Sequence, residues 1–211
     1  MFLFSQKMIE VEVRGRIKNF EKVLNDFRKK AKFVEEKDRF SMVYFRTGSP
    51  INREAVKSEK VDFKLRITNK KPEIVMKYGL VKGSESRKEI LIPIKLEDFD
   101  EAVELFRLIG WEKGVIMATK TFVFMYKGIE FALVHNKKLE YFEAEKLVEK
   151  DENTEEVISE IRKVCGDFGL EFFSEDEFFR VLDSINQEKE LQFNLTEQDF
   201  SDVKKKFKEF F

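Results

Sequence analysis

The sequence predicts an α+β protein in which a closed antiparallel eight-stranded β-barrel forms a tunnel with helices packed on its outside. Three observations support this class: residues 8–17 alternate strictly, later stretches repeat the alternation, and amphipathic helical patterns follow the first and fifth strands. In the first strand one face is apolar and the other is charged. The apolar face carries Ile9, Val11, Val13 and Ile17, and the charged face carries Glu10, Glu12, Arg14 and Arg16.

Seven further strands are expected at residues 40–47, 62–68, 73–78, 86–94, 115–126, 129–134 and 140–148. Most of them repeat the division into an apolar face and a charged face. The charged residues are Lys64, Arg66, Lys77, Arg87, Glu89, Lys120, Glu143 and Glu145. Closure into a barrel accounts for this division, because the apolar faces then meet covering helices while the charged faces line a water-filled lumen. The alternative is an open sheet whose wet face neutralises itself through ion pairs.

The helical segments define the expected domain organisation. Residues 19–31 and 97–109 carry apolar stripes at helical spacing, and residues 151–211 contain three more such segments. We therefore predict a tunnel barrel over residues 1–150 and a C-terminal set of helices over residues 151–211 packed on it.

Composition excludes several classes of function. Lys and Arg number 40 against 41 Asp and Glu, and a formal net charge of −1 argues against a non-specific nucleic-acid binder. The single cysteine, Cys165, and single histidine, His135, exclude an intramolecular disulfide, a cysteine zinc cluster and a histidine-rich metal site. A metal site would therefore be built from carboxylates, which suit Mg²⁺, Mn²⁺ or Ca²⁺. No apolar run approaches the ~20 residues of a membrane span, so a cytoplasmic protein without a membrane partner is expected.

The charged motifs resemble those of the CYTH superfamily, the triphosphate tunnel metalloenzymes, which include class IV adenylyl cyclases and thiamine triphosphatases. Residues 10–14 resemble the opening ExExK motif, 44–47 resemble YFDT, 64–66 stand where the family has RxR, and 142–145 match the closing FxExE. Lys77, Arg87, Glu89 and Lys120 match single positions of the motifs between them. The match covers residues 8–148 in order.

This resemblance implies a site for a metal-bound triphosphate, with Mg²⁺ or Mn²⁺ as cofactor. It implies catalytic roles for Glu10, Glu12 and Arg14. The implied metal ligands are Glu10, Glu12, Glu89, Glu143 and Glu145, and the implied phosphate-binding residues are Arg14, Arg16, Lys64, Arg66, Lys77, Arg87 and Lys120. Seven positive and five negative side chains leave this set two charges positive, which suits an anion.

The sequence departs from the family pattern at five positions. Arg14 replaces a lysine, Leu91 and Val134 stand where acids belong, and Phe122 replaces an arginine. Lys64 for arginine also loses bidentate geometry. Missing acids weaken metal and proton handling more than the electrostatic grip on phosphates.

Hydrolysis of tripolyphosphate, a nucleoside triphosphate or thiamine triphosphate is therefore the first expectation for function. Cyclisation of ATP, as in class IV adenylyl cyclases, is the second, and a non-catalytic phosphate- or nucleotide-binding protein on the same fold is the third. A purely structural barrel with internally paired charges is a fourth. The expected partner is a small-molecule triphosphate bound by a monomer or homodimer, with no nucleic acid.

Overall fold

The fold was analysed in a computed structural model, which describes residues 8–45, 61–78, 88–136, 138–149 and 153–211. The described chain divides into two compact units. The first contains the described residues of Met1–Glu36 and Lys120–Glu175, and the second those of Lys37–Val81, Arg87–Thr119 and Asp176–Phe211. Two long strands, β2 (Lys32–Phe45) and β6 (Lys113–Tyr126), contribute residues to both units.

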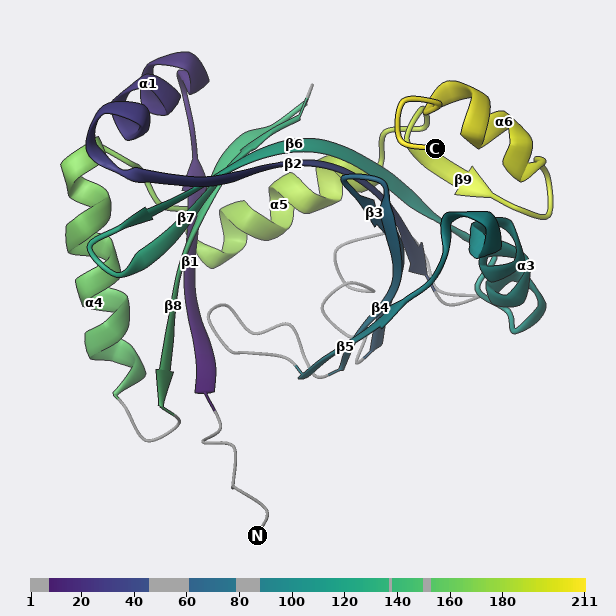
Figure 1. Cartoon of the computed structure of the whole chain (residues 1–211), viewed down its shortest axis with the longest axis horizontal. Helices are drawn as coiled ribbons and strands as arrows, with labels where there is room; N and C mark the ends of the chain where they lie inside the picture. The colour runs from purple at the N-terminus through teal and green to yellow at the C-terminus, as the bar shows by residue number, and fades with distance from the viewer. Residues whose placement is uncertain (1–7, 46–60, 79–87, 137, 150–152) are drawn as a thin grey trace, which may run out of the picture. The chain divides into compact units, whose positions relative to one another are not determined.

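The first unit is an antiparallel sheet with strand order β1-β8-β7-β6-β2 and helices on its apolar face. Its other strands are β1 (Met8–Arg16), β7 (Ile129–His135) and β8 (Glu140–Glu149), and its helices are α1 (Phe20–Lys30) and α4 (Thr154–Cys165). Asn19 caps α1 as predicted, because its side chain accepts a hydrogen bond from the backbone of Lys22. Figure 1 shows α4 running beside β8 and β1, which it contacts.

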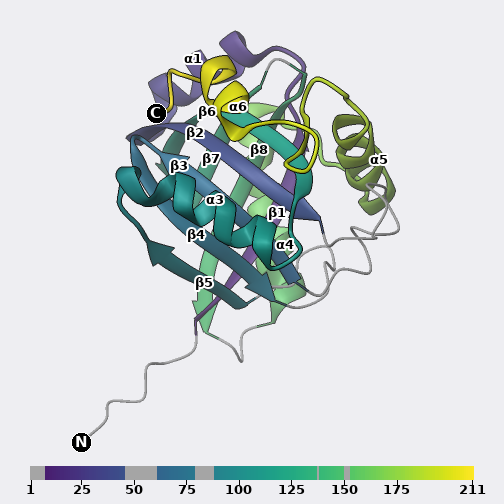
Figure 2. The same cartoon turned by 90° about the vertical axis from the view of Figure 1, so that its right-hand side faces the viewer.

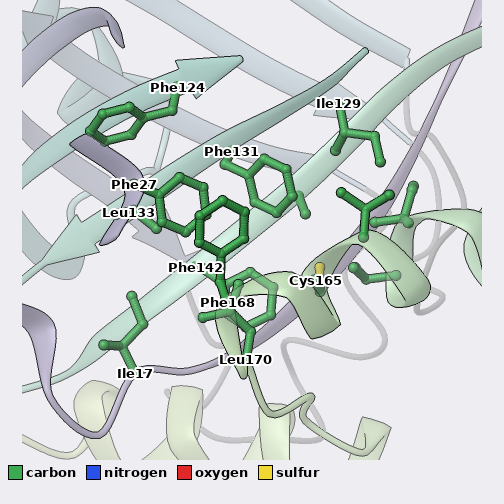
Figure 3. Packing of buried hydrophobic residues seen from close by; sticks show 14 of the residues in the cluster. Ile17, Phe27, Phe124, Ile129, Phe131, Leu133, Phe142, Cys165, Phe168 and Leu170 are labelled. Atoms are coloured by element: carbon green, nitrogen blue, oxygen red, sulfur yellow. The ribbon is translucent and has the colours of Figure 1, made fainter. Parts of the chain in front are cut away.

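The apolar face of β1 is buried in the core of the first unit, as the alternation predicts. Val11 is fully buried, and so are Phe131 on β7 and Phe142 on β8. Phe27 of α1 stacks on Phe168, which lies in the short 3-10 helix Gly166–Phe168, with ring centroids 3.7 Å apart. Figure 3 shows these rings gathered over the sheet. Burial of this face leaves the even-numbered residues of β1 for the opposite face of the sheet.

Gly15 fits the free edge of β1 against the chain that follows α4. A Cβ atom at Gly15 would lie 1.9 Å from the carbonyl oxygen of Glu171. Next to this approach, the backbone N–H of Phe173 donates to the carbonyl of Arg14 over 3.0 Å. The segment after α4 therefore covers this edge and orients β1 at Arg14.

The second unit is an antiparallel sheet with order β6-β2-β3-β4-β5, and a short strand β9 (Gln192–Asn194) also pairs with β6. Its remaining strands are β3 (Val61–Thr68), β4 (Lys71–Tyr78) and β5 (Lys88–Pro93). Its helices are α3 (Phe99–Leu108), α5 (Glu175–Asn186) and α6 (Phe200–Lys206), with a 3-10 turn at Leu96–Asp98. Figure 2 shows α3 lying across the sheet. Phe99 and Phe106 of α3 belong to one buried cluster with Phe40, Leu65 and Ile67 of the strands.

Three features differ from the predicted architecture. The strand order ends at β1 and β5, so the pairings of the described residues form an antiparallel sheet with two ends and do not show a closed barrel. Strand β2 begins at Lys32, eight residues before the predicted start, because charged residues there still join the ladder. The C-terminal region is not purely helical, since β9 adds three residues to the sheet. In the described residues no helix is long and apolar enough to cross a membrane.

Candidate functional site

One face of the sheet in the first unit packs on the apolar core. The other face gathers carboxylates from the adjacent strands β1, β8 and β7. The register pairs Glu12 of β1 with Glu145 of β8, and Glu145 with Glu130 of β7. One step along, Arg14 pairs with Glu143. Because residues two apart share a face, Glu10 belongs to the same group. We call this group the carboxylate cluster; its members are Glu10, Glu12, Glu130, Glu143 and Glu145, with Arg14 among them.

Arg14 bridges two members of the carboxylate cluster. Its Nη2 donates to Glu12 Oε2 over 2.6 Å, and its Nε donates to Glu143 Oε1 over 3.0 Å. Burial opposes the charged guanidinium, but the charges of Glu143 and Glu12 outweigh that effect and raise the pKa of Arg14 above its ordinary value. Arg14 therefore stays a cation and holds both carboxylates in place.

One oxygen of Glu12 has no hydrogen bond among the described residues. Glu12 Oε1 is buried and lies 2.5 Å from Arg14 Nε, but that N–H points to Glu143 instead. The Glu12 side chain is only 15% exposed. Burial, followed by the charge of Glu143, raises the pKa of Glu12 to about 8, although Arg14 acts in the opposite direction. The ionised carboxylate is thus poorly compensated.

The pKa of Glu145 is also raised, and burial is again the largest cause. Burial comes first, then the charges of Glu10 and Glu130 and a hydrogen bond with Glu10, and together they raise the pKa of Glu145 to about 8. Glu130 escapes the sequence patterns, because it is a single acid in an otherwise apolar stretch. The register of the two-residue β6–β7 hairpin, with Tyr126 opposite Ile129, is the signal that places it on this face.

The donor chemistry of the carboxylate cluster fits a hard divalent cation. Its ligands are all oxygens, one buried oxygen accepts no hydrogen bond among the described residues, and the pKa values of two of its carboxyls are raised to about 8. Among the described residues, however, no group of three or more His, Cys, Asp or Glu side chains is gathered closely enough to hold an ion. The cluster therefore offers oxygen atoms of the kind that Mg²⁺ or Mn²⁺ prefers, but its described side chains do not form a gathered ion site.

The second unit carries a face on which three of the predicted phosphate-binding residues are each paired with an acid. Arg66 Nε lies 2.7 Å from Glu73 Oε1, and its Nη2 lies 3.9 Å from Glu89 Oε1. The ammonium of Lys77 lies 3.4 Å from Glu89, and that of Lys64 lies 3.2 Å from Asp62. We call this surface the basic face; its cations are Lys64, Arg66, Lys77 and Arg39. Glu89, predicted as a metal ligand, is thus the partner of two cations here.

Arg39 belongs to the basic face although the sequence patterns pass over it. The register sets Arg39 of β2 opposite Thr68, and its Nε donates to Thr68 Oγ1 over 3.2 Å. On the same face Ser41 is buried opposite Arg66. Arg39 was missed because the first half of β2 contains charges of both signs on both faces and was not predicted as a strand.

Lys120 does not lie on the charged face, and its predicted position there is wrong. The register sets Thr121 opposite Val134, which lies on the same face as Glu130. Lys120 is the next residue along the strand and therefore lies on the other face, with Phe122 and Phe124. There its ammonium pairs with Glu36 at 2.6 Å and lies 5.8 Å from the ring centroid of Phe122. Arg16 lies on the charged face and is exposed. Arg87 lies outside the described residues.

The positions that depart from the family pattern lie in three different environments. Val134 shares the face of Glu130 and is 4% exposed, whereas Leu91 shares the face of Glu89 and is 51% exposed. Phe122 is buried in the core of the first unit. An acid at Val134 would therefore be buried, and β7 carries its acid four residues earlier, at Glu130.

Comparison with solved structures identifies the fold. PH1012 from Pyrococcus horikoshii OT3 matches with a TM-score of 0.61 and 24% identity, over 80% of this chain and 93% of that one. A Vibrio parahaemolyticus protein described as "a putative adenylate cyclase" matches with a TM-score of 0.60 and 16% identity, over 83% and 99% of the two chains. The chain has a CYTH-like fold.

A third structure connects this fold with triphosphates. HpAC1 from Hippeastrum matches with a TM-score of 0.53 and 15% identity, over 82% of this chain and 95% of that one, and its structure was described as revealing a dominant triphosphatase activity. No family model and no curated protein matches the sequence. At these identities the comparisons establish the CYTH-like fold, which confirms the resemblance seen in the charged motifs.

Proposed function

We propose that this CYTH-like chain binds a triphosphate compound together with Mg²⁺ or Mn²⁺ and hydrolyses it. The observation that carries the proposal is the carboxylate cluster, in which the register gathers five acids around the single guanidinium of Arg14. So many carboxylates on one face are costly to ionise without further cations. A divalent cation would supply the missing charge and polarise phosphoryl oxygens.

The basic face supports the same proposal. Lys64, Arg66 and Lys77 each have an acidic partner on the basic face. The basic face therefore offers little net positive charge to a bare anion. A triphosphate that arrives with its cation is less negative, so these acids repel it less than they repel the bare anion. Among the described residues, Asp62, Glu73 and Glu130 add acids to the charged faces, Arg39 adds a cation, and Lys120 lies elsewhere, so these side chains do not carry the expected excess of two positive charges.

Turnover is the direct test. Purified protein would be incubated with tripolyphosphate, ATP and thiamine triphosphate, each with Mg²⁺ or Mn²⁺, while released phosphate, pyrophosphate and cyclic AMP are measured. We expect phosphate release that Glu145→Gln reduces by about tenfold or more, because one charged ligand is lost. Glu21→Gln is the matched control, since Glu21 is exposed on α1 outside the cluster. If cyclic AMP were the main product from ATP, the activity would be cyclisation and not hydrolysis.

Binding without turnover is the second candidate, and a specific observation favours it. The resemblance calls for acids at two positions that are Val134, which is buried, and Leu91, which is exposed. Neither position therefore supplies a carboxylate. Arg14 cannot pass a proton, because its guanidinium stays charged. Tight binding of tripolyphosphate with no released phosphate, under any of the conditions above, would establish this non-catalytic function.

A further inference from the structure

The charged face of β2, β3 and β4 is unevenly charged along its length. The three predicted phosphate-binding residues on it are each paired with an acid. At one end of the face the register sets Arg39 of β2 opposite Thr68 of β3, and Thr68 opposite Lys71 of β4. We call these three residues the end row. The end row joins two cations and a hydroxyl group and contains no carboxylate.

The β3–β4 hairpin fixes the position of Lys71. Its turn residues, Asn69 and Lys70, have φ angles of 48° and 64°, as a two-residue turn of type I′ requires. This turn sets Lys71 directly opposite Thr68, so the two side chains share a face. Lys70 is used elsewhere, because its ammonium donates to two backbone carbonyls of the segment after α6. Lys71 is exposed, and among the described residues no acid pairs with it.

The strands around the end row leave its charge distinct from the rest of the face. The next residue of β4 on the same face is Glu73, and its Oε1 lies 2.7 Å from Arg66 Nε. On the other side of β2 lies β6, whose residues 114–119 carry no charged side chain. The end row therefore adds two cations at one end of a face that is otherwise balanced in charge.

The cations of this face extend further than a triphosphate. Lys77 and Lys71 lie six residues apart on β4, which corresponds to about 20 Å along a strand. The phosphates of a triphosphate are joined through single bridging oxygens, so the whole group is much shorter than this span. The organic part of the substrate does not supply the missing anion, because a nucleoside is neutral and thiamine is a cation. Further phosphates of a linear chain would supply it.

We propose that the end row binds phosphate groups beyond the third, so that the substrates of this protein are linear polyphosphates longer than triphosphate. This inference rests on the proposed function and names its substrate class. Arg39 offers a planar fork of N–H donors to phosphate oxygens, and Lys71 offers an ammonium. Thr68 is a positioning residue, since its Oγ1 accepts a hydrogen bond from Arg39 Nε over 3.2 Å.

The dependence of binding on chain length can be measured without turnover. Calorimetry would compare tripolyphosphate with a longer linear polyphosphate, each with Mg²⁺ and with concentrations counted per chain. For the wild type we expect the longer chain to bind tighter by about tenfold or more, because more charge-assisted contacts form. Arg39→Gln combined with Lys71→Gln should remove most of this preference and weaken tripolyphosphate binding by less than about threefold. Lys205→Gln, exposed on α6, is the matched control and should change neither affinity.

The change in preference is the decisive quantity. A longer chain also gains affinity because it offers several overlapping positions, but the variants keep that gain. Lys71→Gln alone should reduce the preference in the same direction, and its exposed position keeps the fold intact. Circular dichroism of each variant checks that loss of binding does not come from loss of fold.

The outcomes separate this inference from the proposed function. An unchanged preference in the double variant, or equal weakening of both ligands, would overturn the role of the end row and leave the proposed function standing. Tighter binding of a single-stranded oligonucleotide than of a polyphosphate of equal charge would also overturn it, because the ligand would then be a nucleic acid. If the wild type binds neither tripolyphosphate nor the longer chain, the proposed function itself fails.

Discussion

Replacing Glu12 by glutamine should change how the stability of the metal-free protein depends on pH. The pKa of Glu12 is raised from 4.5 to about 8, chiefly by burial and then by Glu143. Between these two values the folded protein holds a proton that the unfolded chain has released. Rising pH therefore favours the unfolded chain, and stability falls from about pH 5 to about pH 8.

The size of this loss follows from the same displacement. Each pH unit in the window costs up to about 1.4 kcal/mol, so a carboxyl that titrated alone over the whole window would cost about 5 kcal/mol. Glu12 does not titrate alone, because its charge is coupled to those of Glu145 and the neighbouring acids. We therefore expect Glu12→Gln to reduce the fall in the free energy of unfolding by about 2 kcal/mol. The Gln side chain keeps the shape of the neutral acid, and Arg14 keeps its bond to Glu143.

Urea denaturation at about pH 5 and about pH 8, with a chelator present, measures this effect. Circular dichroism is the appropriate signal, because the single tryptophan, Trp111, packs in the second unit and Glu12 lies in the first. The variant should lose less stability than the wild type between the two pH values. An equal loss in both proteins would refute the account of Glu12 as a poorly compensated buried carboxyl.

Three further tests, two of them with a control substitution, address other parts of the account. Arg66→Ala should weaken tripolyphosphate binding by about tenfold or more in calorimetry, since it removes a charge-assisted contact; unchanged affinity would exclude Arg66 from the site. Gly15→Ala should destabilise the fold by about 2 kcal/mol or more in urea, because its Cβ would meet a backbone oxygen, whereas Gly166→Ala, with nothing within 4 Å, should be neutral or slightly stabilising. Phe27→Ala should cost about 3–5 kcal/mol because the side chain is fully buried, whereas Phe33→Ala, at 51% exposure, should cost far less; equal losses in thermal denaturation would contradict the packing described.

Alternation along a strand predicted the faces of β1, β3 and β8 correctly. Apolar and charged residues alternate at every position over 9–14, 61–67 and 142–145, so the pattern alone separates the core face from the wet face. Arg14, Arg66 and Glu145 therefore lie on the expected faces.

The same reasoning failed where a strand is apolar on both faces. Lys120 lies in β6 between Thr119 and Thr121. Nothing in that stretch of sequence indicates which of these three side chains lies on the charged face of the sheet. Glu130 on β7 is ambiguous for the same reason. Only the pairing with neighbouring strands fixes these two residues, and pairing depends on contacts between distant parts of the chain.

Strand order and short strands were also beyond the sequence patterns. A charged face shows that a strand has a wet side but not which strands are neighbours, so the pairing of β6 with β2 was not predicted. Strand β9 has three residues, too few to show a period. The closed barrel was inferred from the shared division of faces, and an open antiparallel sheet with one wet face produces the same division.

Cation-dependent binding of a triphosphate is the central claim, and calorimetric titration of tripolyphosphate tests it most directly. The titration would be run into wild-type protein with Mn²⁺ present and again with a chelator. We predict saturable binding that weakens by about tenfold or more without the cation, and a similar loss in Glu145→Gln with Mn²⁺ present. No binding heat with Mn²⁺, or equal affinity with and without it, would contradict the assignment of the carboxylate cluster.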